Sequence, residues 1–148
     1  GVFYEFEEDP DLCFVDFHQD GATLYPGTGF INETGKGKAV GAKLNIPLPP
    51  NSTDKIAKAL WKKAEDFIDK FKPEFILLQC GADSLEDDPI TQLKLTSKFH
   101  SYVASRLSHL ASKHCDGRLL VMGGGGYNLD NIKSAWNDVI KELIHTNK

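Results

Sequence analysis

Two loops in the sequence combine reactive side chains with glycine. The apolar run over residues 75–80 leads through Gly81 to Asp83, and a second apolar run over residues 119–122 leads into four consecutive glycines and Tyr127. Glycines are costly in conformational entropy, so a run of four indicates special backbone angles or the close approach of another group. If the two runs are neighbouring strands, as consecutive strands of a crossover often are, a carboxylate and a phenol share one crevice.

Less specific interpretations of these residues remain open. Asp83 fits a turn in Gly-Ala-Asp-Ser as well as it fits a catalytic role, and the ring of Tyr127 could pack at the start of a helix. A dinucleotide-binding loop is the second hypothesis for the glycine run. The spacing disfavours it, because counting from Gly123 and Gly125 puts Asn128 where the last glycine of GxGxxG belongs.

Four segments that could position these loops are expected to form strands. Residues 12–17, 75–80 and 119–122 are unalternating apolar runs bounded by Gly, Pro or Asp, a pattern typical of strands buried on both faces. Residues 42–46 alternate apolar and polar side chains and are followed by prolines. This pattern predicts a peripheral strand.

Three segments show helical spacing of apolar residues. The first starts after residues 51–54 and stops before Pro73, the second starts at Thr96 as its N-cap, and the third follows Asn128. The expected apolar stripe of the first helix comprises Ile56, Leu60, Ala64, Phe67 and Phe71. Strands that alternate with amphipathic helices predict an α/β fold, with a mostly parallel sheet in a three-layer α/β/α arrangement.

Composition excludes several classes of protein. The chain has 148 residues, 41% hydrophobic and 26% charged, which is typical of one globular domain. No apolar run approaches the roughly 18 residues that cross a bilayer, so we expect no membrane span. A net charge of −4 without a basic cluster argues against direct binding of nucleic acid. Cys13, Cys80 and Cys115 form neither a disulfide framework nor a thiolate metal motif, which favours a reducing cytoplasm.

Six blocks of sequence stand out by their order and spacing. They are His18-Gln19-Asp20-Gly21, Leu24-Tyr25-Pro26-Gly27-Thr28-Gly29, Gly35-Lys36-Gly37, Leu78-Gln79-Cys80-Gly81-Ala82-Asp83-Ser84, Asp88-Pro89 and Gly123-Gly124-Gly125-Gly126-Tyr127-Asn128. Taken together, the six blocks resemble the histone deacetylase family. They are similar to its microbial members, which include acetoin utilisation proteins and acetylpolyamine amidohydrolases.

The resemblance implies an arginase-like fold and the hydrolysis of an acetyl amide on a lysine-like or polyamine amine with the help of zinc. Asp83 matches the family's metal-ligating aspartate, and a carboxylate oxygen suits a catalytic zinc that keeps one position open. Tyr127 matches the tyrosine whose hydroxyl hydrogen-bonds the amide carbonyl as it becomes an oxyanion.

Four further residues match substrate-binding positions of the family. Tyr25 matches an aromatic side chain that lines the narrow tunnel for the acyl-lysine chain, and Ile90 matches a second wall position. Gly125 and Gly126 would let the substrate chain pass close to the backbone. The implied ligand is an acetylated amine, either acetyl-lysine or an acetylpolyamine.

The family also uses an Asp-x-His pair as metal ligands and a His-His pair as general base, and neither occurs here in its expected place. In family order, residues 3–11 lie just after that segment. We therefore expect residues 1–148 to be the C-terminal portion of one deacetylase domain. Alone it would be inactive, with an incomplete zinc site, and the N-terminal half or another chain would supply the rest. The alternative is a catalytically inactive ligand-binding or assembly module of the same fold.

Asp16 and His18 form a second Asp-x-His pair. On a strand both side chains share one face and could supply two metal ligands. The match to the family opposes this, because the histidine ahead of Leu-Tyr-Pro-Gly-Thr-Gly is not a zinc ligand there. Asp16 also replaces a small residue that helps to hold a monovalent cation in many relatives, which leaves that cation site open.

The other histidines, His100, His109, His114 and His145, are expected on the surface or on helix flanks. Cys80 is expected to be a packed small hydrophobic residue rather than a nucleophile.

The absent Asp-x-His-His segment belongs, in the family, to a strand between those that correspond to residues 12–17 and 75–80. Without it the sheet has a gap or two unpaired edges, and exposed edges recruit other chains. We predict either direct closure of the gap or strand pairing between molecules, including homo-oligomers.

Overall fold

A computed structural model describes residues 1–146 of the chain. Its elements, in chain order, are α1 (Val2–Glu5), β1 (Phe14–Gln19), the 3-10 turn η1 (Gly37–Ala39), β2 (Lys43–Leu48), α2 (Asp54–Phe71), β3 (Ile76–Gln79), α3 (Ser97–His114), β4 (Leu119–Met122) and α4 (Leu129–Thr146). The four expected strands and three expected long helices are all present, with ends shifted by at most two residues and with β4 as expected at both ends.

The strands form two parallel pairs. β1 pairs with β2, from Phe14 opposite Lys43 to Gln19 opposite Leu48. β3 pairs with β4, from Ile76 opposite Leu119 to Gln79 opposite Met122. Each pair is joined by a crossover or a long connection, as parallel strands require. The α/β fold with parallel strands is therefore confirmed.

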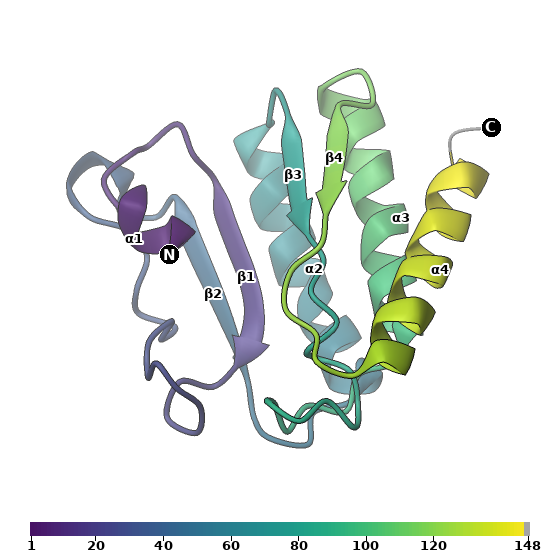
Figure 1. Cartoon of the computed structure of the whole chain (residues 1–148). Coiled ribbons are helices and arrows are strands. Elements are labelled where there is room, and N and C mark those ends of the chain that lie inside the picture. The colour runs from purple at the N-terminus through teal and green to yellow at the C-terminus, as the bar shows by residue number, and fades with distance from the viewer. Residues whose placement is uncertain (147–148) are drawn as a thin grey trace.

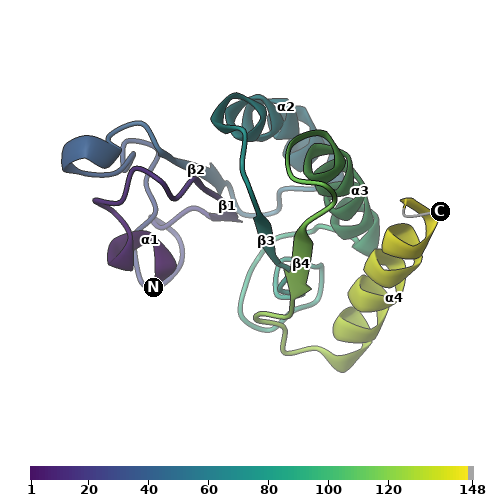
Figure 2. The same cartoon turned by 90° about the horizontal axis from the view of Figure 1, so that it is seen from above.

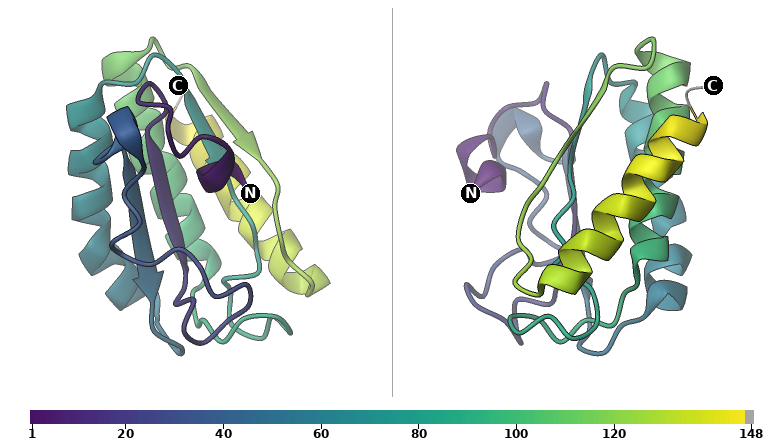
Figure 3. Two further views of the ribbon diagram at one scale, coloured as in Figure 1. Left: turned by 90° about the vertical axis from the view of Figure 1, so that its left-hand side faces the viewer. Right: turned by 45° about the vertical axis from the view of Figure 1, so that its right-hand side comes forward.

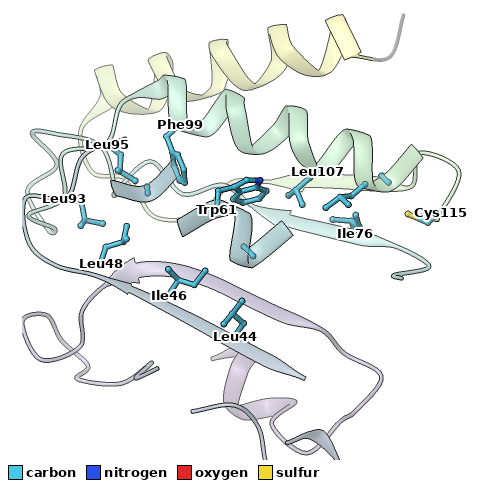
Figure 4. Packing of buried hydrophobic residues seen from close by; sticks show 14 residues of the cluster. Leu44, Ile46, Leu48, Trp61, Ile76, Leu93, Leu95, Phe99, Leu107 and Cys115 are labelled. Carbon is cyan, nitrogen blue, oxygen red and sulfur yellow. The ribbon is translucent and has the colours of Figure 1, made fainter. Parts of the chain in front are cut away.

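The three long helices lie together on one side of the strands. Figure 1 shows α2 and α3 behind the strands and α4 to the right of β4, and Figures 2 and 3 show α1 and the N-terminal loops on the opposite side of β1 and β2. The main core lies beneath α2 and α3, where Trp61 and Phe99 pack with β2 residues such as Ile46 (Figure 4). Helix packing over both strand pairs therefore holds the two pairs in one structure.

Local signals set the helix ends. The Thr96 side chain accepts a hydrogen bond from the Lys98 N–H at 3.2 Å, which caps α3 as expected. The Asn128 side chain accepts from the Asp130 N–H at 3.0 Å at the start of α4. At the other end of α2, Lys72 adopts a left-handed conformation directly before Pro73. These features fix the start of α3 and α4 and the end of α2, and so the limits of the loops next to them.

The buried stripe of α2 differs from the expected one. Ala57, Trp61 and Ala64 are the buried residues, while Ile56 is exposed. The stripe is turned by about one residue because the indole of Trp61 fills the space between β1 and α3, where it stacks on Phe17 with ring centroids 5.9 Å apart.

The gap between the two strand pairs stays open. Within residues 1–146, β1 and β3 share no strand pairing, so the prediction of direct closure is wrong. The carboxyl end of β1 is instead linked to the loop after β3, because the Gln19 side-chain oxygen accepts the Gln92 N–H at 2.7 Å. Helices and this contact hold the two pairs in place without an intervening strand.

One face of the β3–β4 pair is uncovered. Leu77, Leu120 and Met122 are exposed, with Leu77 at 62%, so the expectation that these strands are buried on both faces is wrong. The alternate side chains Ile76, Leu78 and Val121 pack against the helices, whereas nothing among residues 1–146 covers the other face.

Within the same residues, no helix is long and apolar enough to span a membrane.

Candidate active site

The loops that follow β1, β3 and β4 meet at one end of the molecule. All the strands point in the same direction in Figure 1, so their carboxyl ends lie at the lower end of the view. The loop after β1 carries Tyr25, the loop after β3 carries Asp83 and Ile90, and the loop after β4 carries Tyr127. This is the edge at which open parallel sheets bind ligands.

Asp83 is half-buried at the carboxyl end of β3. Burial raises the pKa of its carboxyl group above the usual value, and the nearby negative charges of Asp88 and Asp16 raise it further, while His100 acts in the opposite direction. A carboxylate in such surroundings gains from a cation placed beside it. Asp83 is therefore a suitable single ligand for a metal ion.

The glycine run lies directly against Asp83. The Ala82 N–H donates to the Gly125 carbonyl oxygen at 2.7 Å, which joins the loop after β3 to the loop after β4. A Cβ atom at Gly125 would collide with the Asp83 carboxylate, and one at Gly124 would collide with the Gln79 side chain. Close approach of neighbouring groups therefore explains Gly124 and Gly125.

Tyr127 follows the glycine run and starts the turn into α4. Its side chain is 63% exposed, and its main-chain N–H donates to Asp88 Oδ2 at 2.8 Å. Gly126, just before it, has a φ of 138°, and a Cβ there would press on Ala82 at 3.0 Å. Because β3 and β4 are neighbours as expected, Asp83 and Tyr127 lie on adjacent loops at one edge.

The two expected wall residues are exposed. The side chain of Tyr25 is 93% exposed on the loop after β1, and that of Ile90 is also exposed on the loop after β3. They lie on loops that follow the carboxyl ends of β1 and β3. Ile90 is fixed through its main chain, because its N–H donates to Asp88 Oδ1 at 2.9 Å.

Asp16 and His18 bind each other. His18 Nδ1 lies 3.0 Å from Asp16 Oδ2, and its Nε2 lies 2.8 Å from the Gly29 carbonyl oxygen. Burial lowers the pKa of His18, but the adjacent Asp16 carboxylate and the Gly29 carbonyl outweigh this, and the pKa is raised overall. The Gly29 carbonyl oxygen faces Nε2, whereas Nδ1 lies beside the Asp16 carboxylate without the geometry of a hydrogen bond.

His100 is a functional neighbour that sequence reasoning placed wrongly. It is buried rather than on the surface, and its Nε2 lies 2.8 Å from the Gly81 carbonyl oxygen. Since a carbonyl only accepts, Nε2 carries the proton and donates. His100 thus ties α3 to the backbone two residues before Asp83. The signal in the sequence is its helical spacing with the small residues Ala104 and Ala111, which are also buried.

Asp88 is the second residue whose role sequence reasoning missed. In the sequence Asp88 stands out only as part of Asp88-Pro89, yet it is buried and accepts hydrogen bonds from the N–H groups of Ile90 and Tyr127. The Ile90 N–H is two positions away, in a local turn closed by the Asp88 side chain, but the Tyr127 N–H is 39 positions away, so no local pattern indicates that contact.

The described residues do not form a complete metal site. Residues 1–146 contain no group of three or more His, Cys, Asp or Glu side chains that could hold a metal ion. Cys80 is buried, which raises the pKa of its thiol to about 11 and keeps it protonated near neutral pH. It is the packed residue that the sequence predicted. Asp83 fits as one ligand, but the side chains of residues 1–146 do not make up a full zinc site.

Comparison with known proteins gives one consistent match. Residues 1–143 match the family described as Histone deacetylase domain. The chain is 38% identical over 140 residues to histone deacetylase 14, chloroplastic, of Arabidopsis thaliana, covering 94% of this chain and 33% of that protein. It is 40% identical over 126 residues to a probable deacetylase of Archaeoglobus fulgidus, covering 84% and 34%. With the acetoin utilization protein AcuC of Bacillus subtilis it shares 36% identity over 146 residues, covering 97% and 38%.

Solved structures agree with the fold. The HDA15 HD domain superposes with a TM-score of 0.87 at 28% identity, over 99% of this chain and 41% of that one. The acetylpolyamine aminohydrolase from Burkholderia pseudomallei superposes with a TM-score of 0.86 at 22% identity, over 99% and 42%, which supports the fold alone. The chain spans about a third of the length of the curated relatives that it matches. Because the match runs from residue 1 to residue 143, the chain belongs to the histone deacetylase family.

Proposed function

We propose that the chain forms the C-terminal portion of a zinc-dependent deacetylase domain, which hydrolyses an acetyl amide on a lysine-like or polyamine amine. The observation that supports this most directly is the joining of the Asp83 loop to the glycine loop before Tyr127, through the Ala82 N–H and the Gly125 carbonyl. In the reaction, water adds to the amide carbonyl carbon, the C–N bond breaks, and acetate and the protonated amine leave.

Tyr127 would donate its phenolic hydrogen to the substrate carbonyl oxygen while that oxygen gains negative charge. A hydrogen bond that strengthens in the transition state lowers the barrier by several kcal/mol, roughly 3 to 4 for a single donor. Its exposed side chain leaves the hydroxyl accessible to a substrate. Tyr25 and Ile90 would line the path of the substrate chain, and Gly125 and Gly126 would let that chain pass the backbone.

Asp83 would be one ligand of the zinc ion, whose role is to polarise the carbonyl and activate water. Residues 1–146 bring no further ligands together with Asp83 to complete a metal group, and the family's His-His base does not occur in its expected place in the sequence. The other ligands and the base would come from an N-terminal half of the domain or from another chain. The 148 residues alone would then be inactive. The cytoplasm is the proposed location of the protein, because its three cysteines form no disulfide framework in the sequence.

A second candidate is a catalytically inactive module of the same fold that binds a ligand or assembles with another chain. The absence of a three-residue metal group within residues 1–146 and the uncovered face of β3 and β4 favour it. Homo-oligomers through the open strand edges would be one form of such assembly.

Acetate release separates the two candidates. The protein at its natural full length is assayed with an acetyl-lysine peptide and with an acetylated polyamine, as wild type and as Tyr127→Phe. We expect kcat to fall about 100-fold or more in the variant. Tyr4→Phe, which removes a hydroxyl bound to Glu33 at 2.6 Å on the N-terminal side of the molecule, is the matched control and should keep kcat. A wild type without acetate release would support the inactive module.

A further inference from the structure

Asp88 is a buried carboxylate whose partners are main-chain amides. Its residue is 6% exposed, on the loop between β3 and α3. Oδ1 accepts the Ile90 N–H at 2.9 Å and Oδ2 accepts the Tyr127 N–H at 2.8 Å. Oδ1 thus closes a turn within the loop that carries Asp88 and the proposed wall residue, and Oδ2 holds the loop that carries the proposed oxyanion donor.

The burial of this charge calls for a reason. Within residues 1–146, no Lys, Arg or His side chain forms an ion pair with Asp88. Hydrogen bonds from amides to an ionised acceptor are shorter and stronger than neutral ones, and they offset the loss of water around the carboxylate. A neutral side chain would fill the same space at lower cost in hydration. The carboxylate is therefore suited to holding two N–H groups at once.

Neighbouring contacts hold the same two segments less directly. The Asn131 side chain donates to the Glu86 carbonyl oxygen at 2.9 Å, and the Asn128 side chain donates to the Asp87 carbonyl oxygen at 3.2 Å. Both join the start of α4 to the loop after β3. Asp88 differs from them because it binds the main chain of Tyr127 itself.

We infer that Asp88 is a positioning residue, which fixes the main chain of Tyr127 relative to Ile90 and so orients the tyrosine hydroxyl toward the bound amide. The role assigned to the hydroxyl rests on the proposed function, whereas the coupling of the two loop segments does not. A misplacement of about 1 Å in a catalytic group can cost on the order of 100-fold in rate. Loss of one hydrogen bond at Asp88 therefore acts on catalysis through Tyr127.

The first test measures amide hydrogen exchange by NMR in the 148-residue chain. Asp88→Asn keeps the size of the side chain but replaces one acceptor oxygen with an amino group. We expect exchange at Tyr127 or Ile90 to become about tenfold faster, as loss of roughly 1.4 kcal/mol of protection would give. The matched control is Asp87→Asn, because Asp87 is adjacent and exposed with a positive φ of 69° that Asn also tolerates. Unchanged exchange in Asp88→Asn would overturn the inference.

If Asp88→Asn does not fold, the wild type decides. A scalar coupling across the hydrogen bond, between the Tyr127 amide nitrogen and the Asp88 carboxyl carbon, is expected in the folded chain. Its absence in a well-resolved spectrum would overturn the inference.

The kinetic test uses the protein at its natural full length. We expect Asp88→Asn to lower kcat about 10- to 100-fold with a smaller change in KM, and Asp87→Asn to keep both. In a Tyr127→Phe background, Asp88→Asn should cost little more, because its effect passes through that hydroxyl. An equal loss in both backgrounds would contradict the inference. A wild type that releases no acetate would contradict the proposed function instead, and the exchange experiment would still decide whether Asp88 holds the two segments.

Discussion

The Nε2 atom of His100 lies 2.8 Å from the carbonyl oxygen of Gly81, which joins the middle of the molecule to the edge that carries Asp83. His100 is on α3, which packs against the core. The same helix therefore also fixes the position of the loop after β3. The stability of the core and the geometry of the candidate site are therefore linked through one buried side chain.

His100→Phe should destabilise the fold. The substitution keeps an aromatic ring at this position but removes the N–H donor. The buried Gly81 carbonyl oxygen is then left without its partner, which lowers the free energy of unfolding by about 1 to 3 kcal/mol. Urea unfolding measures the change. His109→Phe is the control, because His109 lies on the same helix with its side chain at the surface. Equal, small changes in both variants would show that the His100 contact contributes little.

Gly125→Ala should disturb Asp83 directly. The added Cβ would occupy the place of the Asp83 carboxylate, so the loop or the carboxylate must move, at about 1 to 3 kcal/mol. Thermal unfolding checks this against Gly123→Ala, where the nearest atom to an added Cβ is Trp136 Cζ2 at an ordinary 3.7 Å. If the two variants unfold at the same temperature, the close approach of the glycine loop to Asp83 is not a constraint.

His18 should make stability depend on pH. Its folded pKa is raised above the ordinary 6.5, mainly because the opposing effect of burial is outweighed by Asp16 and the Gly29 carbonyl. The protonated ring therefore stabilises the fold below about pH 6.5, and this contribution is lost as pH rises through the folded pKa. The difference in unfolding free energy between wild type and His18→Gln, measured in urea at pH 6 and pH 9, should shrink with rising pH. A constant difference would contradict the charged state of His18.

The uncovered face of β3 and β4 should promote self-association of the 148-residue chain. Leu77 and Leu120 expose apolar surface beside an unpaired strand edge, and such edges pair with other chains. Sedimentation velocity should show association that grows with concentration and weakens in Leu77→Lys. Val40→Lys, at an exposed apolar residue in a loop, is the control. A strictly monomeric wild type at high concentration would contradict this prediction.

Much of the fold follows from local patterns in the sequence. Thr96 and Asn128 are readable as caps because each bonds to an amide two or three residues away. The pairing of β3 with β4 follows from their order around a single helix. Burial was harder to predict, since Leu77 and Leu120 have the sequence of a doubly buried strand but lack cover on one face.

The candidate site was only partly predictable. Asp83 and Tyr127 were found because each follows a strand and matches a family motif. The contacts that hold them were missed, because Asp88 and His100 bind main-chain atoms, and main-chain atoms leave no trace in residue type. The side-chain spacing of Asp16 and His18 suggested a metal site, whereas in the structure the two side chains lie 3.0 Å apart and His18 also contacts the Gly29 carbonyl oxygen.

Zinc stoichiometry of the purified 148-residue chain tests most directly whether the chain holds only part of a deacetylase site. Metal content is measured after dialysis against trace zinc, with Asp83→Ala as the control. We expect no specific zinc in either protein, because Asp83 alone does not make a tight site. About one tightly held zinc per chain that is lost in Asp83→Ala would contradict this, since Asp83 would then have found further ligands in this chain or in a second copy.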